Sequence, residues 1–346
     1  MSFLPNNATV GQRLRAAVTS PNSGVVSVIV LVCIFATIKS SVFISVNNGF
    51  NIASQMVFIL LLALGMTIVL ISGGIDLSVG SVMGLCAGVV AKLMIDGVPM
   101  VIAMLLAVAA GAGLGMVNGL IITKLGLPDF VATLAMFGVA RGLLYLWTAG
   151  TPFLDYMTDT YFVIGGLRRP LGYLTVPIIV ALVATLIVAV TLRFTPFGRH
   201  LYGVGSNSHG AMLSGVSVPR VRLLAYVCSG LLAGVAGVLL AGQTTAVAPD
   251  LGTGYEVYAI AAAIIGGAAL SGGRGRAIGA VIGTLTLAVT ANAMNIAGVD
   301  PTWQQVVTGL ILLLSVVLDR ASTLLRSRVV QIPIQPVAAT TAATAR

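Results

Sequence analysis

Residues 52 to 95 read IASQMVFILLLALGMTIVLISGGIDLSVGSVMGLCAGVVAKLMI, which is two long apolar runs joined by a short link that carries Asp76. An apolar stretch of about 20 residues is long enough to cross the hydrocarbon core of a bilayer as a helix. The runs at 52–72 and 79–95 therefore predict two membrane helices. The link between them predicts that one helix ends and the next begins close to a carboxylate.

The composition of the whole chain agrees with this interpretation. Of its 346 residues, 58% are hydrophobic and only 8% are charged, and the mean hydropathy is +1.07. Water-soluble domains of this size do not hold such a balance, and long unbroken runs favour helices over the alternating segments of a membrane β-barrel. The basic residues behind the net charge of +9 gather in the links between runs. This is typical of a protein whose partner is the lipid bilayer, and no nucleic acid partner is expected.

Ten apolar runs predict ten membrane spans. With the N-terminus in the cytoplasm, the outer segments hold only Lys39, Arg168 and Arg169 among the basic residues, as the positive-inside rule requires. Both termini are then cytoplasmic. The chain divides into a leader (1–24), a transmembrane domain (25–320) with a long cytoplasmic loop at 193–222, and a tail (321–346) that we expect to be disordered. The ten runs are 25–43, 52–72, 79–95, 98–122, 129–148, 171–192, 222–242, 256–270, 277–296 and 302–318.

An internal repeat is visible when the Asp76 motif is used as a probe. Asp76-Leu77-Ser78-Val79-Gly80 returns as Asp250-Leu251-Gly252-Thr253-Gly254, and Asn118 is matched by Asn292 at the same offset. The two blocks begin after the first and the sixth predicted spans. An odd shift of five spans gives them opposite orientations in the membrane, so the pattern predicts an inverted repeat of the kind found in many transporters.

Five polar residues are candidates for ordering or lining a transport pathway. Asp76 has two interpretations: a helix-start cap, with Gly73 and Gly74 allowing a tight turn, or part of a broken helix beside a water-filled cavity. Amides inside spans either contact a polyhydroxylated substrate or hydrogen-bond one helix to another. The five candidates are Gln55, Asp76, Ser78, Asn118 and Asn292.

Arg141 is a charge inside the fifth predicted span. A charged side chain at the centre of a membrane helix costs about 2.5–3.5 kcal/mol on insertion scales, so it requires a partner or an aqueous cavity. We expect a structural role for Arg141, and a bond to a carbonyl at a helix end is the simplest form of it.

The chain lacks the motifs of an enzyme. No phosphate-binding loop, zinc-protease motif, dense His/Cys cluster or Ser-His-Asp set is present, so we expect no catalytic residue, no metal site and no cofactor bound by this chain. Spans of proton-driven transporters usually carry acidic or histidine residues, and none was identified deep in a span. The energy for transport is therefore expected from a separate subunit, with an ion-coupled secondary transporter as the alternative.

Six stretches, in order, closely resemble the permease subunits of ribose-type ABC sugar importers. They are GGIDLSVGSVMG (73–84), PDFVATLAMFGVARGLLYL (128–146), TPFGRHLYGVGSN (195–207), AMLSGVSV (211–218), GGAALSGGRGRAIGAVIGTL (266–285) and WQQVVTGLILLLSVVLD (303–319). The resemblance implies a multi-pass subunit of the bacterial inner membrane that transports a sugar or polyol. It also implies a vitamin-B12-importer-like (type II) architecture with a second permease copy, usually as a homodimer.

The partners implied by this resemblance are a tandem ABC ATPase, which binds ATP and Mg, and a periplasmic sugar-binding protein. A permease for branched-chain amino acids is the nearest alternative, and the GGIDLSVGS and WQQVVTG stretches favour the sugar type. The sequence leaves open which sugar or polyol is carried and whether the second permease copy is identical.

The resemblance also assigns a coupling helix that docks in a groove of the ATPase. Ser208, His209 and Gly210 depart from the residues common in the family, and glycine inside a helix costs about 1 kcal/mol relative to alanine. Met212 stands where a basic residue is common. The residues assigned to coupling are Asn207, Ala211, Met212, Leu213, Ser214 and Gly215.

Overall fold

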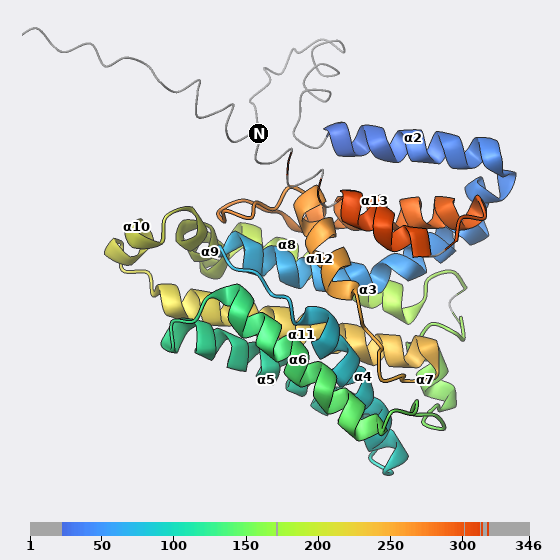
Figure 1. The fold of residues 1–346 in the computed structure, drawn as a ribbon, viewed down its shortest axis with the longest axis horizontal. Helices are drawn as coiled ribbons and strands as arrows, with labels where there is room; N and C mark the ends of the chain where they lie inside the picture. The colour runs from blue at the N-terminus through green and yellow to red at the C-terminus, as the bar shows by residue number, and fades with distance from the viewer. Residues whose placement is uncertain (1–22, 171, 301, 312, 314–316, 318–346) are drawn as a thin grey trace, which may run out of the picture.

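The computed structural model describes residues 23–170, 172–300, 302–311, 313 and 317. Within them every regular element is a helix, apart from one isolated β-bridge between Phe153 and Val247. The elements are α2 (Ser23–Lys39), η1 (Ser41–Ile44), α3 (Val46–Ile71), α4 (Val79–Ile95), α5 (Met100–Lys124), α6 (Asp129–Thr148), α7 (Asp159–Ile164), α8 (Val176–Phe194), α9 (Pro196–Ser206), α10 (Ser208–Leu213), α11 (Val218–Thr244), α12 (Tyr255–Ile265) and α13 (Ala277–Ile296). Figure 1 shows them side by side in one bundle.

Six of these helices are long and apolar enough to cross a membrane, namely α3, α5, α6, α8, α11 and α13. Three shorter apolar stretches are also helical, at Ile29–Lys39, Val79–Ile95 and Tyr255–Ile265. The prediction of an all-helical membrane protein is confirmed, whereas the number of ten crossings stays a prediction. The tail, most of the leader and the end of the run at 302–318 lie outside the described residues.

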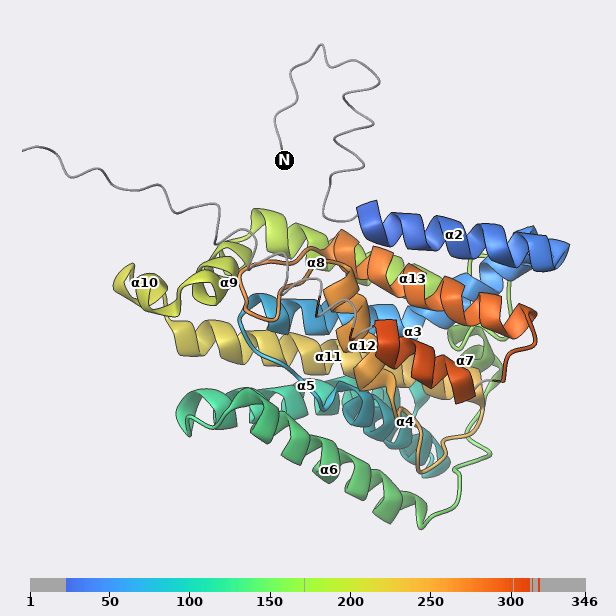
Figure 2. The ribbon, with the colours of Figure 1, turned by 45° about the horizontal axis from the view of Figure 1, so that its top comes forward.

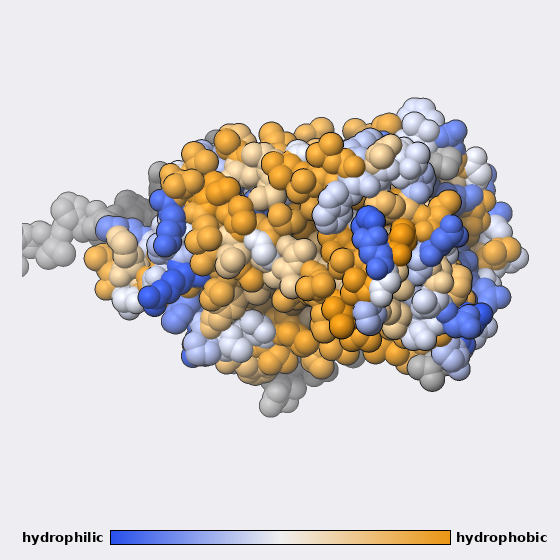
Figure 3. Space-filling model, turned by 90° about the horizontal axis from the view of Figure 1, so that it is seen from below, coloured by the Kyte–Doolittle hydropathy of each residue, from blue (hydrophilic) through white to orange (hydrophobic). Residues whose placement is uncertain are grey.

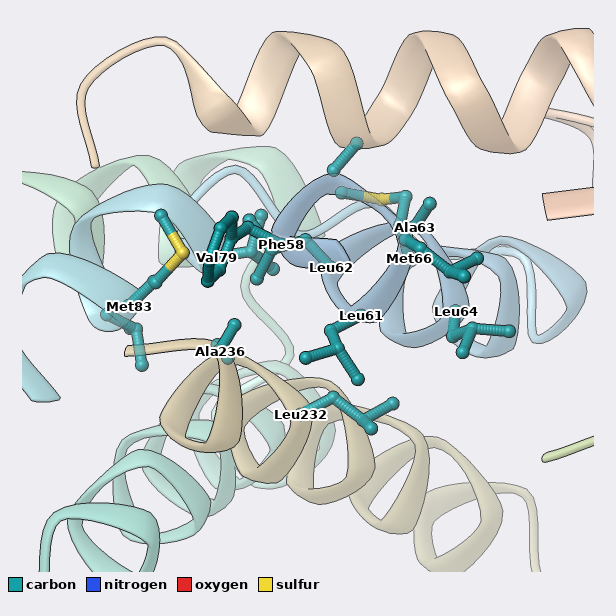
Figure 4. Close-up of a cluster of buried hydrophobic side chains, with 14 of the residues drawn as sticks. Phe58, Leu61, Leu62, Ala63, Leu64, Met66, Val79, Met83, Leu232 and Ala236 are labelled. Atoms are coloured by element: carbon teal, nitrogen blue, oxygen red, sulfur yellow. The ribbon is translucent and has the colours of Figure 1, made fainter. Parts of the chain in front are cut away.

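Helices α3 and α11 form the centre of the bundle. Their most apolar windows are 78% and 67% buried, compared with 22% for both α5 and α8. Figure 4 shows Leu61 of α3 facing Leu232 of α11, and Phe58 of α3 near Met83 of α4. Because residues 56–71 of α3 are apolar on all sides apart from Thr67, this part of the helix is suited to being surrounded by other helices, whereas α5 and α8 leave apolar side chains exposed.

Exposed apolar side chains cover much of the surface of the bundle. Figure 3 shows hydrophobic residues over the middle of one face and hydrophilic residues gathered mainly toward its two ends. Leu105, Leu146 and Leu186, on three different helices, each expose more than 60% of their surface. Apolar side chains exposed in such numbers are matched to lipid tails rather than to water.

Glycines allow α5 and α11 to pack with their backbones in contact. A Cβ atom added at Gly111 or Gly115 would collide with backbone atoms of α11, and one added at Gly230 would collide with backbone atoms of α5. Small residues four apart permit this approach between membrane helices. The spacing alone does not guarantee it, since Gly138 and Gly142 on α6 have nothing within 4 Å of an added Cβ.

Two non-helical links interrupt the bundle. The first link, residues 72–78, joins α3 to α4, and the second link, residues 245–254, joins α11 to α12. The short helices α4 and α12 both start near the middle of the bundle (Figures 1 and 2). Their starts are in contact, because Gly80 and Gly84 of α4 lie against Gly252 and Leu251 of the second link. Helix α12 ends at Ile265, earlier than the predicted run, because Gly266 caps it and Gly267 adopts a left-handed φ of 89°.

Candidate functional site

The carboxylate of Asp76 is buried in the first link, with 1% of the residue exposed. One oxygen accepts hydrogen bonds from the Ser78 amide (3.0 Å) and the Ser78 hydroxyl (2.6 Å), and the other accepts one from the Ser229 hydroxyl of α11 (2.8 Å). A carboxylate away from water requires such donors. Asp76 therefore fixes the backbone just before α4 and joins it to α11.

Asn118 of α5 extends this cluster. Its side-chain amide donates to the Ser78 hydroxyl over 2.9 Å, and the residue has no exposed surface. Its carbonyl oxygen is buried and has no partner among the described residues. The structure thus brings together three of the predicted pathway residues, Asp76, Ser78 and Asn118, in one hydrogen-bonded cluster between α4, α5 and α11.

Ser229 is the member of this cluster that the sequence analysis missed. It lies 153 residues from Asp76 in the chain, within an apolar helix rich in glycine and alanine. A single serine is common in membrane helices, where it often bonds to its own backbone, so nothing local distinguished it. The only available signal was that an isolated buried carboxylate must find donors elsewhere in the chain.

Asn292 lies apart from this cluster. Its side-chain amide and that of Asn48 donate to each other over 2.8 and 2.9 Å, and Asn48 also donates to the Phe43 carbonyl over 3.0 Å. Both asparagines are 5% exposed. The pair joins α13 to the start of α3, so Asn118 and Asn292 have different surroundings although they match in the sequence.

Gln55 lines a polar pocket of about 180 Å³ near the start of α3. Amide, hydroxyl and guanidinium side chains from α3, α11 and the segment between α7 and α8 surround this space. A role for Gln55 in substrate passage stays a prediction. The lining residues are Asn51, Ser54, Gln55, Gly165, Gly166, Leu167, Arg169, Thr175, Pro177 and Gln243.

Arg141 of α6 holds the second link. Its guanidinium donates to the carbonyl oxygens of Leu251 (2.7 Å) and Pro249 (3.4 Å). Neighbouring Glu256, in the first turn of α12, accepts from the Gly254 amide over 3.1 Å, and its second carboxylate oxygen lies beside Gly80. Glu256 is a half-buried charge that the apolar pattern did not reveal, because this residue stands at the first position of a predicted apolar run.

Arg222 of α11 binds the backbone of the first link, as Arg141 binds that of the second. It donates to the Asp129 carboxylate over 2.8 Å and to the Gly73 carbonyl over 3.3 Å. Tyr226, one turn further along α11, donates to the Ile75 carbonyl over 3.3 Å. Each link is therefore held by an arginine from a neighbouring helix that binds its backbone carbonyls.

Helix α10 lies at one end of the bundle, next to α9 (Figures 1 and 2). Asn207 caps it by accepting from the Gly210 amide over 2.9 Å, and Gly215 follows it with a left-handed φ of 81°. Met212 and Leu213 expose 56% and 76% of their surface, while Ala211 packs against the core. Ser214 closes the helix with a bond to the Gly210 carbonyl. A capped short helix that presents two apolar side chains is suited to insertion into a groove on a partner.

A bundle of long apolar helices with polar groups buried at the links between them is typical of membrane transport proteins. The chain belongs to the family described as branched-chain amino acid transport system / permease component, whose model matches residues 48–316.

Several relatives of the chain are named for sugars. The chain is 41% identical to the ribose import permease protein of Bacillus subtilis (strain 168), over 84% of this chain and 90% of that protein. It is 36% identical to the ribose import permease protein of Escherichia coli (strain K12), over 85% and 92%. It is also 34% identical to the D-allose transport system permease protein of the same organism, over 84% and 89%. No solved structure matches the chain.

Proposed function

We propose that this chain is the permease subunit of an ABC importer that carries a sugar or sugar-like polyol across the bacterial inner membrane. Family membership and relatives named for ribose and D-allose import support this function. They favour a sugar over a branched-chain amino acid, although the family description mentions the latter. The structural observation that carries the proposal is α10, a capped helix with Met212 and Leu213 exposed at one end of the bundle.

The architecture that we propose is a type II importer with ten spans and an inverted repeat, in which two permease copies enclose the pathway. Two features support the repeat. Helix α3 is followed by the first link and the short helix α4, just as α11 is followed by the second link and the short helix α12. Both links also contain the Asp-Leu motif, at Asp76 and Asp250. The proposed orientation has both termini and α10 in the cytoplasm.

In the proposed cycle a periplasmic binding protein delivers the sugar, and a separate ATPase subunit, which binds ATP and Mg, supplies the energy. In this cycle the two links of the chain have two arrangements, and they change from one to the other when α10 moves. Asp76 with Ser229, Arg222 with Gly73 and Arg141 with Leu251 are the bonds that set one of these arrangements. Because packed interfaces have discrete arrangements rather than a continuum, a small shift at α10 is sufficient to select one.

The test is an affinity pull-down of the tagged chain in mild detergent from its native membrane. We expect wild type to recover an ABC ATPase and the Leu213→Glu variant to lose it, because a buried carboxylate in an apolar contact is costly. Leu125→Glu is the matched control. Leu125 is 71% exposed, similar to Leu213 at 76%, and lies at the end of α5 rather than on α10.

Two outcomes contradict the proposal. Equal recovery of the ATPase with Leu213→Glu and Leu125→Glu contradicts docking through α10. Recovery of no ATPase by wild type in several detergents favours an ion-coupled secondary transporter, which liposomes containing the chain alone then test. Uptake of radiolabelled D-ribose, D-allose and L-leucine in cells with and without the gene distinguishes the sugar function from the amino acid function.

A further inference from the structure

Three backbone segments meet beside α10 with hardly any side chain between them. They are the end of α3 with the start of the first link (residues 71–73), the last turn of α9 (residues 205 and 206) and part of the connection between α12 and α13 (residues 272–275). We call this meeting point the glycine junction. In Figures 1 and 2 the connection between α12 and α13 passes next to α9 at the α10 end of the bundle.

Hydrogen bonds fix the glycine junction. The Gly273 amide donates to the Ile71 carbonyl over 2.9 Å, and the Tyr202 hydroxyl of α9 donates to the Gly275 carbonyl over 2.7 Å. The Ile71 carbonyl is one of the last carbonyls of α3, which have no partner within their own helix. A segment about 200 residues further along the chain therefore completes the end of the central helix.

The glycines leave no space for a side chain. A Cβ at Gly205 would collide with the Ile71 carbonyl oxygen and the Gly273 amide, and a Cβ at Gly272 would collide with the Gly205 carbonyl and the Gly73 backbone. Gly272 also has a left-handed φ of 83°, which disfavours other residues. Contacts between backbones cannot be relieved by a change of side-chain rotamer. A displacement of α9 toward residues 71–73 or 272–275 therefore pushes directly on their backbone.

The glycine junction lies between the proposed docking helix and the first link. Helix α9 passes directly into α10 through Asn207, which caps α10. On the other side, the carbonyl of Gly73 is held by Arg222 and that of Ile75 by Tyr226, immediately before Asp76. The contacts from α10 to the buried carboxylate are thus continuous.

We propose that the glycine junction transmits movements of α10 to the first link and to the connection between α12 and α13, with Gly205 and Tyr202 as positioning residues. The inference rests on the proposed function and adds to it the residues through which the ATPase acts. Tight packing without transmission is the competing explanation. Transmission and tight packing predict different transport activities when the glycine junction is altered while the ATPase stays bound.

The test uses the complex of permease and ATPase, recovered by pull-down and reconstituted in liposomes, with native periplasmic extract as the source of binding protein. Radiolabelled D-ribose is the first probe, and its accumulation is measured together with ATP hydrolysis. Gly205→Ala places a methyl group in the junction. Gly203→Ala on the same helix is the matched control, because an added Cβ there has nothing within 4 Å. Tyr202→Phe removes one hydrogen bond and keeps the ring.

We expect Gly205→Ala and Tyr202→Phe to retain the ATPase while the sugar accumulated per ATP hydrolysed falls by about two- to thirtyfold, the range of typical coupling energies. Gly203→Ala is expected to behave as wild type. If Gly205→Ala does not insert, Tyr202→Phe decides alone.

A normal ratio of sugar to ATP in Tyr202→Phe, with the ATPase still bound, would overturn the role of the junction and leave the proposed function intact. Absence of any ATPase from the wild-type complex would overturn both. A loss of transport in Gly203→Ala equal to that in Gly205→Ala would also overturn the role of the junction, because the effect would then come from α9 as a whole.

Discussion

The two links follow the same local pattern, and an arginine of a neighbouring helix binds the backbone of each, but only the first link also carries a buried aspartate. In the first link the buried carboxylate of Asp76 accepts from Ser78 and from Ser229 of α11, so this side chain holds the link in addition to Arg222. In the second link Asp250 is exposed, and Arg141 of another helix holds the backbone from outside. Similar sequences thus give one link whose aspartate is buried among donors and one whose aspartate is exposed.

The largest expected difference is between the two aspartates. Asp76→Ala leaves three donors without an acceptor, and each unsatisfied buried group costs about 1–3 kcal/mol, so we expect a loss of at least about 3 kcal/mol. Asp250→Ala changes an exposed residue and is expected to stay within about 0.5 kcal/mol of wild type. Size-exclusion chromatography after heating in detergent measures both variants. Equal melting temperatures would show that Asp76 does not fix the first link.

Glycines in the two links provide a second comparison. Gly252 and Gly73 have similar left-handed φ values of 84° and 82°. A Cβ at Gly252 would also collide with the Gly80 carbonyl, whereas at Gly73 nothing lies within 4 Å. Alanine at Gly73 is expected to cost about 1 kcal/mol of backbone strain, and alanine at Gly252 about 1–3 kcal/mol more, from overpacking. The same heating assay tests which variant is less stable. A greater loss of stability for Gly73→Ala than for Gly252→Ala would contradict the close approach of the second link to α4.

The two arginines are predicted to differ in their coupling to carboxylates. Arg222 and Asp129 form an ion pair, with 28% and 17% of their side chains exposed, whereas Arg141 bonds to carbonyls. A double-mutant cycle of Arg222→Ala with Asp129→Asn is therefore expected to give a coupling energy of about 1 kcal/mol. The matching cycle of Arg141→Ala with Glu256→Gln is expected to give a smaller coupling energy. Unfolding by titration with SDS measures both, and the reverse order would show that Glu256 is the true partner of Arg141.

The smallest expected effect comes from the hydroxyl groups. Ser229→Ala removes one of the three donors to Asp76 and is expected to cost about 1 kcal/mol. Thr253→Ala removes a bond to the Asp250 carbonyl in an exposed turn and is expected to cost less than about 0.5 kcal/mol. Melting temperatures in detergent again provide the measurement. A neutral Ser229→Ala would mean that Ser78 alone satisfies the carboxylate.

Hydropathy predicted where the helices lie because crossing a bilayer imposes a length and an apolar composition that a single sequence displays. Asp76 and Ser78 were both among the five candidate residues, but their bond to each other was not predicted. Hydropathy did not predict Ser229 as the partner of Asp76 or Asn48 as the partner of Asn292, because these bonds join segments 153 and 244 residues apart. Glu256 was missed because a charge in the first turn of a short apolar helix resembles the edge of a span.

The long separation between Asp76 and Ser229 has a consequence for biosynthesis. Ribosomes add about 5–20 residues per second, so roughly 8 to 30 seconds pass between synthesis of the carboxylate and synthesis of its hydroxyl partner on α11. During this interval α3 and α4 have emerged while one oxygen of Asp76 still lacks its donor from α11. Until α11 has been synthesised, this oxygen of Asp76 therefore requires another donor, from water or from the insertion machinery.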